Sequence, residues 1–210
     1  LADLTIIKSP IIRFYLQIIF LIIFIINQNL SINDIRIDFL NILLENYYFN
    51  IFFVLFCILV FLNGSNFIDG NNCLAIGYFV IIFLAISILN HYNFIIYNSE
   101  VSTSFLIILT ILLIFNFAGK LYLGDGGIYL LSIFSCFILI TIYNTNNQIS
   151  PYFIANLLWY PAFEILFSLI RKLRSRLSPM DPDIMHLHQL IFYFYKQKLN
   201  LKIYLLNSLT

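Results

Sequence analysis

The stretch YYFNIFFVLFCILVFLNGSNFIDGNN (residues 47–72) contains both features on which the fold and the function of this chain depend. Its first part, residues 47–62, is an uncharged apolar run close to the ~20 residues that a helix needs to cross a bilayer. Its second part, residues 63–72, changes abruptly to asparagine, glycine and aspartate. This pattern predicts a membrane span that delivers polar side chains to one face of the membrane.

The composition of the whole chain agrees with a membrane protein. Of its 210 residues, 61% are apolar and 10% are charged, whereas soluble domains average roughly 45–50% apolar and 25% charged residues. This argues against a soluble globular protein and, because disordered chains are poor in apolar residues, against a disordered one. A formal net charge of +1 argues against nucleic acid as a partner.

Six apolar segments have the length and composition of membrane spans: residues 11–27, 47–62, 73–89, 101–118, 127–143 and 151–170. Residues 190–209 are also apolar but are interrupted by lysines, which indicates an interfacial helix followed by the beginning of a seventh span. The predicted fold is therefore all-α, a polytopic transmembrane helical bundle of six to seven spans. Residues 1–210 form a single integral membrane domain. Because the pattern begins abruptly at Leu1, we expect a fragment that lacks N-terminal spans and the last C-terminal span.

Lysine and arginine predict the orientation. Residues 1–10, 63–72, 119–126 and 171–189 form the loops of one side and, with Arg13 at the membrane edge, hold seven of these cations. The loops of the other side hold only Arg36. Since cytoplasmic loops carry the excess of Lys and Arg, we expect the first set in the cytoplasm. The same set also groups carboxylates, glycines and histidines, so any chemistry is expected there.

The loop NGSNFIDGNN offers a first candidate site. On a helix continuing from the second span, Asn63, Asn66 and Asp69 are three residues apart and share one face. Two amides and a carboxylate can hold a polar ligand or a metal-bound phosphate, and Gly70 permits a sharp reversal. The alternative is a solvated loop that caps the next helix.

The stretch LGDGGIYLL (residues 123–131) offers a second candidate. Glycines let a backbone approach a phosphate closely, and the Asp125 carboxylate suits Mg²⁺, a hard ion that prefers oxygen ligands. Lys120 can offset phosphate charge. The alternative is a turn in which Asp125 caps a helix.

The stretch RKLRSRLSPMDPDIMHLHQL (residues 171–190) has four cations, two prolines and then His186 and His188. With no cysteine or third histidine nearby, imidazoles beside cations favour a pyrophosphate or nucleotide over a transition metal. Cations after a span are also typical of a topology signal or an anionic-lipid site. The His-x-His spacing directs both rings the same way only in an extended segment. Prolines lack a backbone donor, so we expect the preceding helix to end and the chain to fold back.

Glu164 is an ionisable residue within the last predicted span. Such residues are usually functional or paired. Glu164 lies two helical turns before Arg171, so a paired structural carboxylate is the alternative to a functional role.

Four stretches, in order, resemble the polyprenyl-phosphate N-acetylhexosamine-1-phosphate transferase family, and most closely its family 4 glycosyltransferases. This family includes the undecaprenyl-phosphate N-acetylglucosamine-1-phosphate transferases and the phospho-N-acetylmuramoyl-pentapeptide transferases. The stretches are ADLTIIKSPIIRF (2–14), NGSNFIDGNNCLA (63–75), LGDGGIYLL (123–131), and YPAFEILFSLIRK with SPMDPDIMHLHQL (160–172 and 178–190).

The resemblance implies an enzyme that transfers a sugar 1-phosphate from a UDP-N-acetylhexosamine to undecaprenyl phosphate and releases UMP. It implies a Mg²⁺ cofactor, with Mn²⁺ as an alternative, and a place in the bacterial inner membrane with the site facing the cytoplasm. Catalytic roles fall on Asp3, Asp69 and Asp125, of which Asp125 and Asp69 are the expected metal ligands. The expected substrate-binding residues are Asn63, Asn66, Lys120, Arg171, Arg174, His186 and His188. The lipid bilayer is a further partner, and a homodimer is compatible with the sequence.

The chain departs from the family at two positions. Relatives have an adjacent acidic pair where this chain has Ala2 and Asp3, and a glycine where it has Cys73. A member that has lost catalysis and serves as a membrane scaffold or lipid-carrier binder is therefore a second hypothesis, favoured by Ala2. A transporter is a third, but it would carry midspan polar residues and broken helices, and only Glu164 qualifies.

Overall fold

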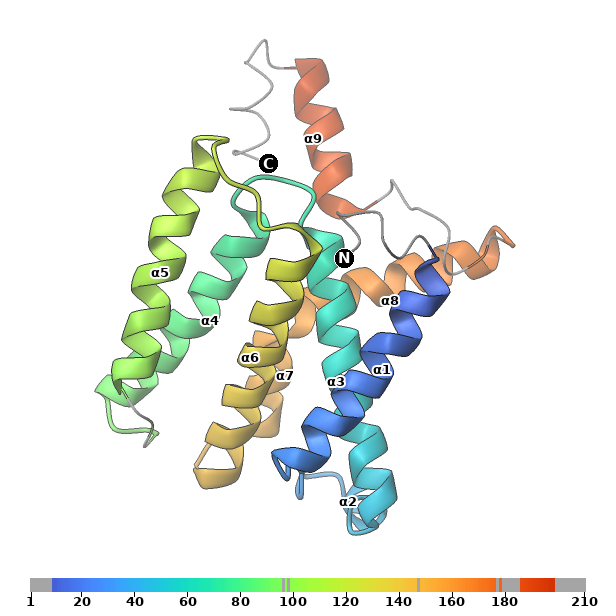
Figure 1. Cartoon of the computed structure of the whole chain (residues 1–210), viewed down its shortest axis with the longest axis vertical. Helices are drawn as coiled ribbons and strands as arrows, with labels where there is room; N and C mark the ends of the chain where they lie inside the picture. Colours follow the sequence, from blue (N-terminus) through green and yellow to red (C-terminus); the bar gives the residue numbers. More distant parts are fainter. Residues whose placement is uncertain are drawn as a thin grey trace.

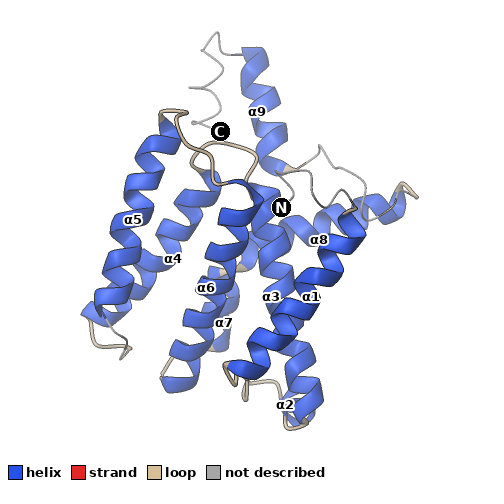
Figure 2. Cartoon of the chain, in the orientation of Figure 1, coloured by secondary structure: helices blue, strands red, loops and turns tan. Residues whose placement is uncertain are grey.

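The computed structural model describes residues 9–95, 97, 99–146, 148–176, 178 and 186–198. Within these residues all regular secondary structure is helical, which confirms the predicted all-α class (Figure 2). The helices are α1 (Pro10–Asn27), α2 (Asp38–Leu44), α3 (Tyr47–Ile68), α4 (Leu74–His91), α5 (Ser99–Phe117), α6 (Gly124–Thr145), α7 (Pro151–Leu157), α8 (Trp159–Arg174) and α9 (Leu187–Lys198).

Five of these helices are long and apolar enough to cross a membrane, or six spans if the bent pair α7 and α8 is counted as one. The chain is therefore a multi-pass membrane protein, as the apolar segments predicted. Helix α9 begins the predicted interfacial segment, and the remainder of residues 190–209 lies outside the described residues from position 199 onward. Asp3 likewise lies outside them.

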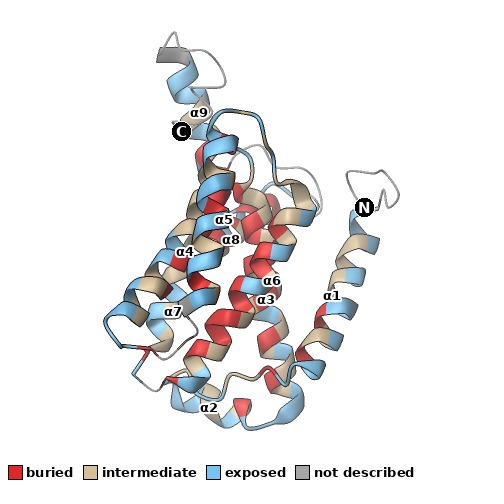
Figure 3. Cartoon of the chain, turned by 60° about the vertical axis from the view of Figure 1, so that its left-hand side comes forward, coloured by how far each residue is buried: buried red, intermediate tan, exposed pale blue. Residues whose placement is uncertain are grey.

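Helix α3 is the centre of the bundle. It packs against α1, α2, α4, α6 and α8, while α4 and α5 form a neighbouring pair (Figure 1). Buried residues concentrate on α3 and α6, and α1 is largely exposed (Figure 3). Exposed apolar side chains such as Phe20, Ile107 and Ile114 suit helices surrounded by lipid, where no polar coat is needed.

The predicted span over residues 151–170 is not one straight helix, because it breaks between Leu157 and Trp159 and bends by 66°. Pro161 has no backbone N–H and cannot bond the Leu157 carbonyl one turn earlier. The Tyr78 hydroxyl of α4 donates to that carbonyl instead, at 2.5 Å. Helix α3 packs tightly against the break, since a Cβ on Gly64 would overlap the Pro161 carbonyl.

Two helices extend beyond their predicted limits and shape the candidate site. Helix α3 continues from the predicted span to Ile68 and so carries Asn63 and Asn66 on helical backbone. Helix α6 starts at Gly124, which adopts a left-handed φ of 64° that glycine tolerates at no steric cost. The beginning of α1, the end of α3, the beginning of α6 and α9 all lie at the upper end of the bundle in Figure 1.

Candidate active site

Asp125 lies in the first turn of α6 and forms an ion pair with Arg13 of α1. The Arg13 Nη1 and Asp125 Oδ2 atoms are 3.4 Å apart, and each side chain is 33% exposed. A negative carboxylate at this end of a helix also interacts favourably with the helix dipole. Leu123, not Asp125, occupies the N-cap position, so the alternative that Asp125 is merely a helix cap is not supported.

Asp69 ends α3 and lies close enough to Asp125 for the two charges to repel. Burial, together with the negative charge of Asp125, raises the pKa of Asp69 from 3.8 to about 6. The prediction that these two carboxylates converge from distant parts of the chain is consistent with this interaction. A half-buried carboxylate that repels its neighbour is destabilised until a cation or a proton reaches it.

An apolar cavity of about 330 Å³ adjoins the Arg13–Asp125 ion pair, between α1, α3 and α6. Its walls include Leu16, Phe20 and Leu62 as well as Gln17. The Arg13 Nε and Gln17 Oε1 atoms are buried and have no hydrogen-bond partner among the described residues. Buried polar atoms are rarely left unpaired, so this cavity suits a ligand with a polar head and an apolar chain.

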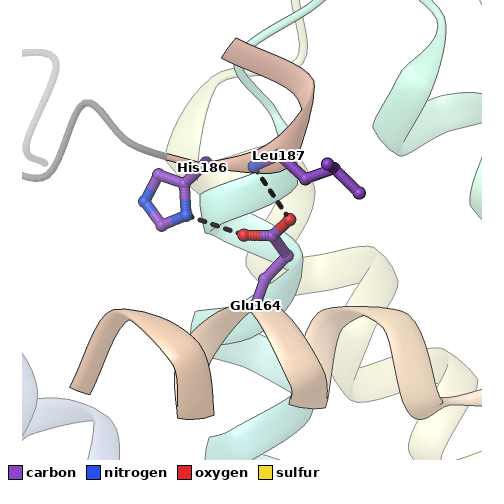
Figure 4. Close-up of polar contacts among 3 residues, drawn as sticks. All are labelled: Glu164, His186 and Leu187. Carbon is purple, nitrogen blue, oxygen red and sulfur yellow. Dashed lines mark hydrogen bonds and ion pairs between the residues drawn. The ribbon is translucent and has the colours of Figure 1, made fainter. Parts of the chain in front are cut away.

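His186 precedes α9 and is fixed to α8 by Glu164. Its Nδ1 atom lies 2.9 Å from Glu164 Oε2, and the Leu187 backbone N–H donates to Oε1 at 3.2 Å (Figure 4). Both side chains are almost fully buried. Glu164 is therefore paired, as the alternative interpretation expected, but its partners come from the histidine segment.

The two histidine rings lie against the end of α3. The centroid of the His186 ring lies 4.9 Å from that of the Phe67 ring. The His188 ring is parallel to the His186 ring, and the centroids of these two rings are 5.7 Å apart. The prediction that the rings align only in an extended segment is wrong, because His188 lies in the first turn of α9. The two rings stack on each other, and the His186 ring also packs on Phe67 of α3.

His188 packs directly over Gly70. A Cβ on Gly70 would lie 2.5 Å from His188 Nε2, and the Asn71 side-chain amide donates to the His188 carbonyl at 3.3 Å. Gly70 lies in the turn between α3 and α4, and it also permits the close approach of His188. The left-handed residue of this turn is Cys73, with a φ of 67°.

A sequence model of glycosyl transferase family 4 matches residues 3–143 of the chain. The chain belongs to this family. Its members are polyprenyl-phosphate sugar-1-phosphate transferases, which in general depend on Mg²⁺. No curated protein and no solved structure matches the chain. The matched region includes Asp69 and Asp125 and ends before Glu164 and the histidines.

The chain offers carboxylate ligands for a divalent cation, but fewer than a complete coordination shell needs. Asp69 and Asp125 offer the oxygen ligands that Mg²⁺ prefers, and Mg²⁺ typically keeps several waters and uses one or two protein carboxylates. Among the described residues no group of three or more His, Cys, Asp or Glu side chains could hold a metal. Any Mg²⁺ bound here would therefore be held by these two carboxylates, with water and substrate oxygens as its remaining ligands.

The other predicted substrate-binding residues are less closely tied to these carboxylates. The Asn63 side chain donates to the Leu59 carbonyl at 2.9 Å, and the Asn66 carbonyl accepts the Asp69 backbone N–H at 3.4 Å. Lys120 is exposed in the turn before α6. Arg171 and Arg174 lie in the last turn of α8, whose end projects sideways from the bundle, away from α6 (Figure 1).

His188 is a predicted substrate-binding residue, but its surroundings disfavour a charged ring. Burial and the neighbouring His186 lower the pKa of His188 from 6.5 to about 4, although Glu164 opposes this shift. Both of its ring nitrogens are buried without a partner among the described residues. At neutral pH the ring is uncharged, so it supports the arrangement by packing rather than by charge.

Three polar residues near this site were not predicted from the sequence as site residues. Arg13 entered only as a topology signal, although Arg13 and Gln17 are four residues apart in an otherwise apolar span, which is a visible sign of a shared polar face. The third is Lys172, which is buried with its Nζ atom 6.0 Å from the centre of the Phe67 ring. Its burial could not be read from a run of four cations.

Proposed function

We propose that this chain transfers an N-acetylhexosamine 1-phosphate from a UDP-sugar to undecaprenyl phosphate and releases UMP. The reaction would start a lipid-linked cell-surface glycan at the cytoplasmic face of a bacterial inner membrane. Membership of the family supports the reaction class. The excess of Lys and Arg on the loops at the site end supports the orientation.

One observation carries the proposal. Asp69 and Asp125 come together at one end of a membrane bundle, with Arg13 and an apolar cavity beside them. Carboxylates suit a divalent cation, a guanidinium suits a phosphate, and apolar walls suit an isoprenoid chain. A water-soluble phosphate donor and a lipid-borne phosphate acceptor can meet only at such a membrane face.

Different residues of the chain would bind the metal ion and the lipid phosphate. Asp125 and Asp69 would hold Mg²⁺, which when bound offsets the negative charge of the diphosphate and of departing UMP. Arg13 exchanges Asp125 for the lipid phosphate, and the first isoprene units enter the cavity lined by Leu16 and Phe20. An oxygen of the lipid phosphate attacks the sugar-bearing phosphorus, a new P–O bond forms, and the bond to UMP breaks.

The remaining predicted roles concern the donor substrate. His186 would contact the diphosphate, with Asn63, Asn66, Lys120, Arg171 and Arg174 as further expected contacts. His188 holds the segment in place by packing on Gly70. Asp3 stays a predicted catalytic residue, outside the described part of the chain.

The direct test is release of UMP by the purified protein in lipid nanodiscs with undecaprenyl phosphate, Mg²⁺ and UDP-N-acetylglucosamine or UDP-N-acetylgalactosamine. We expect Mg²⁺-dependent turnover that Asp125→Asn lowers at least ~10²-fold, the scale of a lost preorganised electrostatic group. Asp38→Asn, on the exposed first turn of α2, is the matched control. Binding of undecaprenyl phosphate without UMP release would instead support the inactive scaffold that Ala2 favours.

A further inference from the structure

We propose that Glu164 is the positioning residue of the nucleotide-sugar site, because it sets which nitrogen of His186 faces the substrate and fixes His186 relative to Asp69. The inference rests on the proposed function, in which His186 contacts the diphosphate. Glu164 lies outside the region matched by the family model, which ends at residue 143. It would not touch substrate itself.

Glu164 uses both of its oxygens on two consecutive residues at the start of α9. Oε2 accepts from His186 Nδ1 at 2.9 Å, and Oε1 accepts from the Leu187 backbone N–H at 3.2 Å (Figure 4). The first contact fixes a side chain, and the second fixes the backbone that carries it. One carboxylate on the bent last span therefore contacts both His186 and the first residue of α9.

The burial of the Glu164–His186 pair indicates a role other than stabilising the fold. Glu164 is 3% exposed and His186 is 4% exposed. Replacement of a buried ionisable pair by well-packed apolar side chains is often neutral or stabilising. Holding α8 against α9 does not by itself require a carboxylate and an imidazole, whereas presenting a polar ring nitrogen does.

The contact at Nδ1 leaves Nε2 as the nitrogen for a ligand. The partner of one ring nitrogen decides the role of the other. His186 makes no second hydrogen bond within the described part of the chain, and its Nε2 atom is not among the fully buried unpaired atoms. The ring is therefore held at Nδ1, and no described residue bonds its Nε2 atom.

The same ring is placed relative to the candidate metal ligands. His186 packs on Phe67 at 4.9 Å and on His188 at 5.7 Å, and His188 rests on Gly70. Phe67 and Gly70 flank Asp69 in the sequence. Glu164 thus links the bent span to the end of α3, and a change at Glu164 moves the histidine without touching Asp69.

A glutamine at this position cannot replace the carboxylate. Glutamine has one acceptor oxygen and an amide that only donates, so one of the two N–H groups would face another donor. An aspartate keeps the charge and both oxygens but is one methylene shorter. Glutamine lacks the second acceptor and aspartate lacks the reach, so both variants should disturb the two contacts.

The test measures binding of UDP and of undecaprenyl phosphate, with Mg²⁺ present, to the unaltered protein, Glu164→Gln, His186→Ala and the double variant. Isothermal titration reports both dissociation constants without any need for turnover. Glu45→Gln, at an exposed position at the other end of the bundle, is the matched control. Melting followed by the fluorescence of Trp159, the one tryptophan, reports folding.

We expect Glu164→Gln to weaken UDP binding about tenfold, the effect of losing one charge-assisted hydrogen bond, with undecaprenyl phosphate binding unchanged. In the His186→Ala background the same substitution should add nothing, because Glu164 acts through His186. Glu164→Asp serves if Glu164→Gln does not fold, and should show the same selective loss.

Three results would overturn the inference. Equal loss of UDP and lipid binding would indicate a general structural role for Glu164. Full additivity with His186→Ala would show that Glu164 acts independently of His186. Unchanged UDP binding in His186→Ala, or no UDP binding by the unaltered protein, would remove the histidine role as well, while UMP release still decides the proposed reaction separately.

Discussion

Gly70→Ala is the substitution whose effect follows most directly from the packing of the histidine segment. The new Cβ would lie 2.5 Å from His188 Nε2 and 3.1 Å from Cδ2. His188 is 1% exposed, so its ring has little room to retreat. The ring must move, and its parallel neighbour His186 moves with it.

The expected cost is about 1–3 kcal/mol in the free energy of unfolding, the usual price of forcing extra volume into a packed contact. For a chain of this size that corresponds to a decrease in Tm of about 2–12 °C. Fluorescence of Trp159 during heating measures it. UDP binding should weaken in parallel, because the substitution displaces His186 from the end of α3.

Two controls make the result specific. Gly77→Ala in α4 places its Cβ 3.8 Å from the nearest side-chain atom, an ordinary contact, and should leave Tm unchanged or slightly raised. Gly70→Ala combined with His188→Ala should be no less stable than His188→Ala alone, since the clash is gone. A Gly70→Ala protein that melts and binds UDP like Gly77→Ala would refute the packing of His188 on Gly70.

Three further predictions follow from other positions. Cys73→Gly should raise the free energy of unfolding by about 1 kcal/mol, since a left-handed φ of 67° penalises a side chain; Cys57→Gly, inside α3, should lower it in the same melting assay. Because the folded pKa of Asp69 is raised from 3.8 to about 6, its contribution to stability is present below pH 3.8 and lost as the pH rises to 6. The Tm of the metal-free protein minus the Tm of Asp69→Asn should therefore decrease between pH 3.8 and pH 6. A difference that stays constant over this range would contradict the raised pKa of Asp69. In intact cells an impermeant thiol reagent should label Tyr92→Cys but not Lys120→Cys above the background of the unaltered chain; the reverse would invert the proposed orientation.

The membrane helices were predictable because apolar runs of bilayer length have few alternatives. Helices α1, α4 and α5 match their predicted ranges within a few residues. The break at Leu157 was not predicted, although Pro161 is visible in the sequence, because hydropathy does not register a lost backbone donor. The hydrogen bond that compensates it comes from Tyr78, on another helix, and no local pattern could supply that partner.

The candidate site was predictable where its residues stand in short polar motifs at the ends of spans. Asp69 and Asp125 were predicted in this way, and the structure brings the two carboxylates within electrostatic reach of each other. The ion pair between Arg13 and Asp125 was not predicted, because helical periodicity relates residues three or four apart. Arg13 lies 112 residues from Asp125 in the sequence. Glu164 has a cation two turns along its own helix, yet its structural partner is His186, 22 residues away, because the chain folds back after α8.

Binding of a divalent cation by Asp69 and Asp125 together is tested most directly by titrating the purified protein with Mn²⁺ and following the free ion by electron paramagnetic resonance. We predict one site that is lost in Asp69→Asn and in Asp125→Asn, retained in Asp38→Asn, and displaced by Mg²⁺. Unchanged Mn²⁺ binding in both carboxylate variants would show that these residues are not the metal ligands.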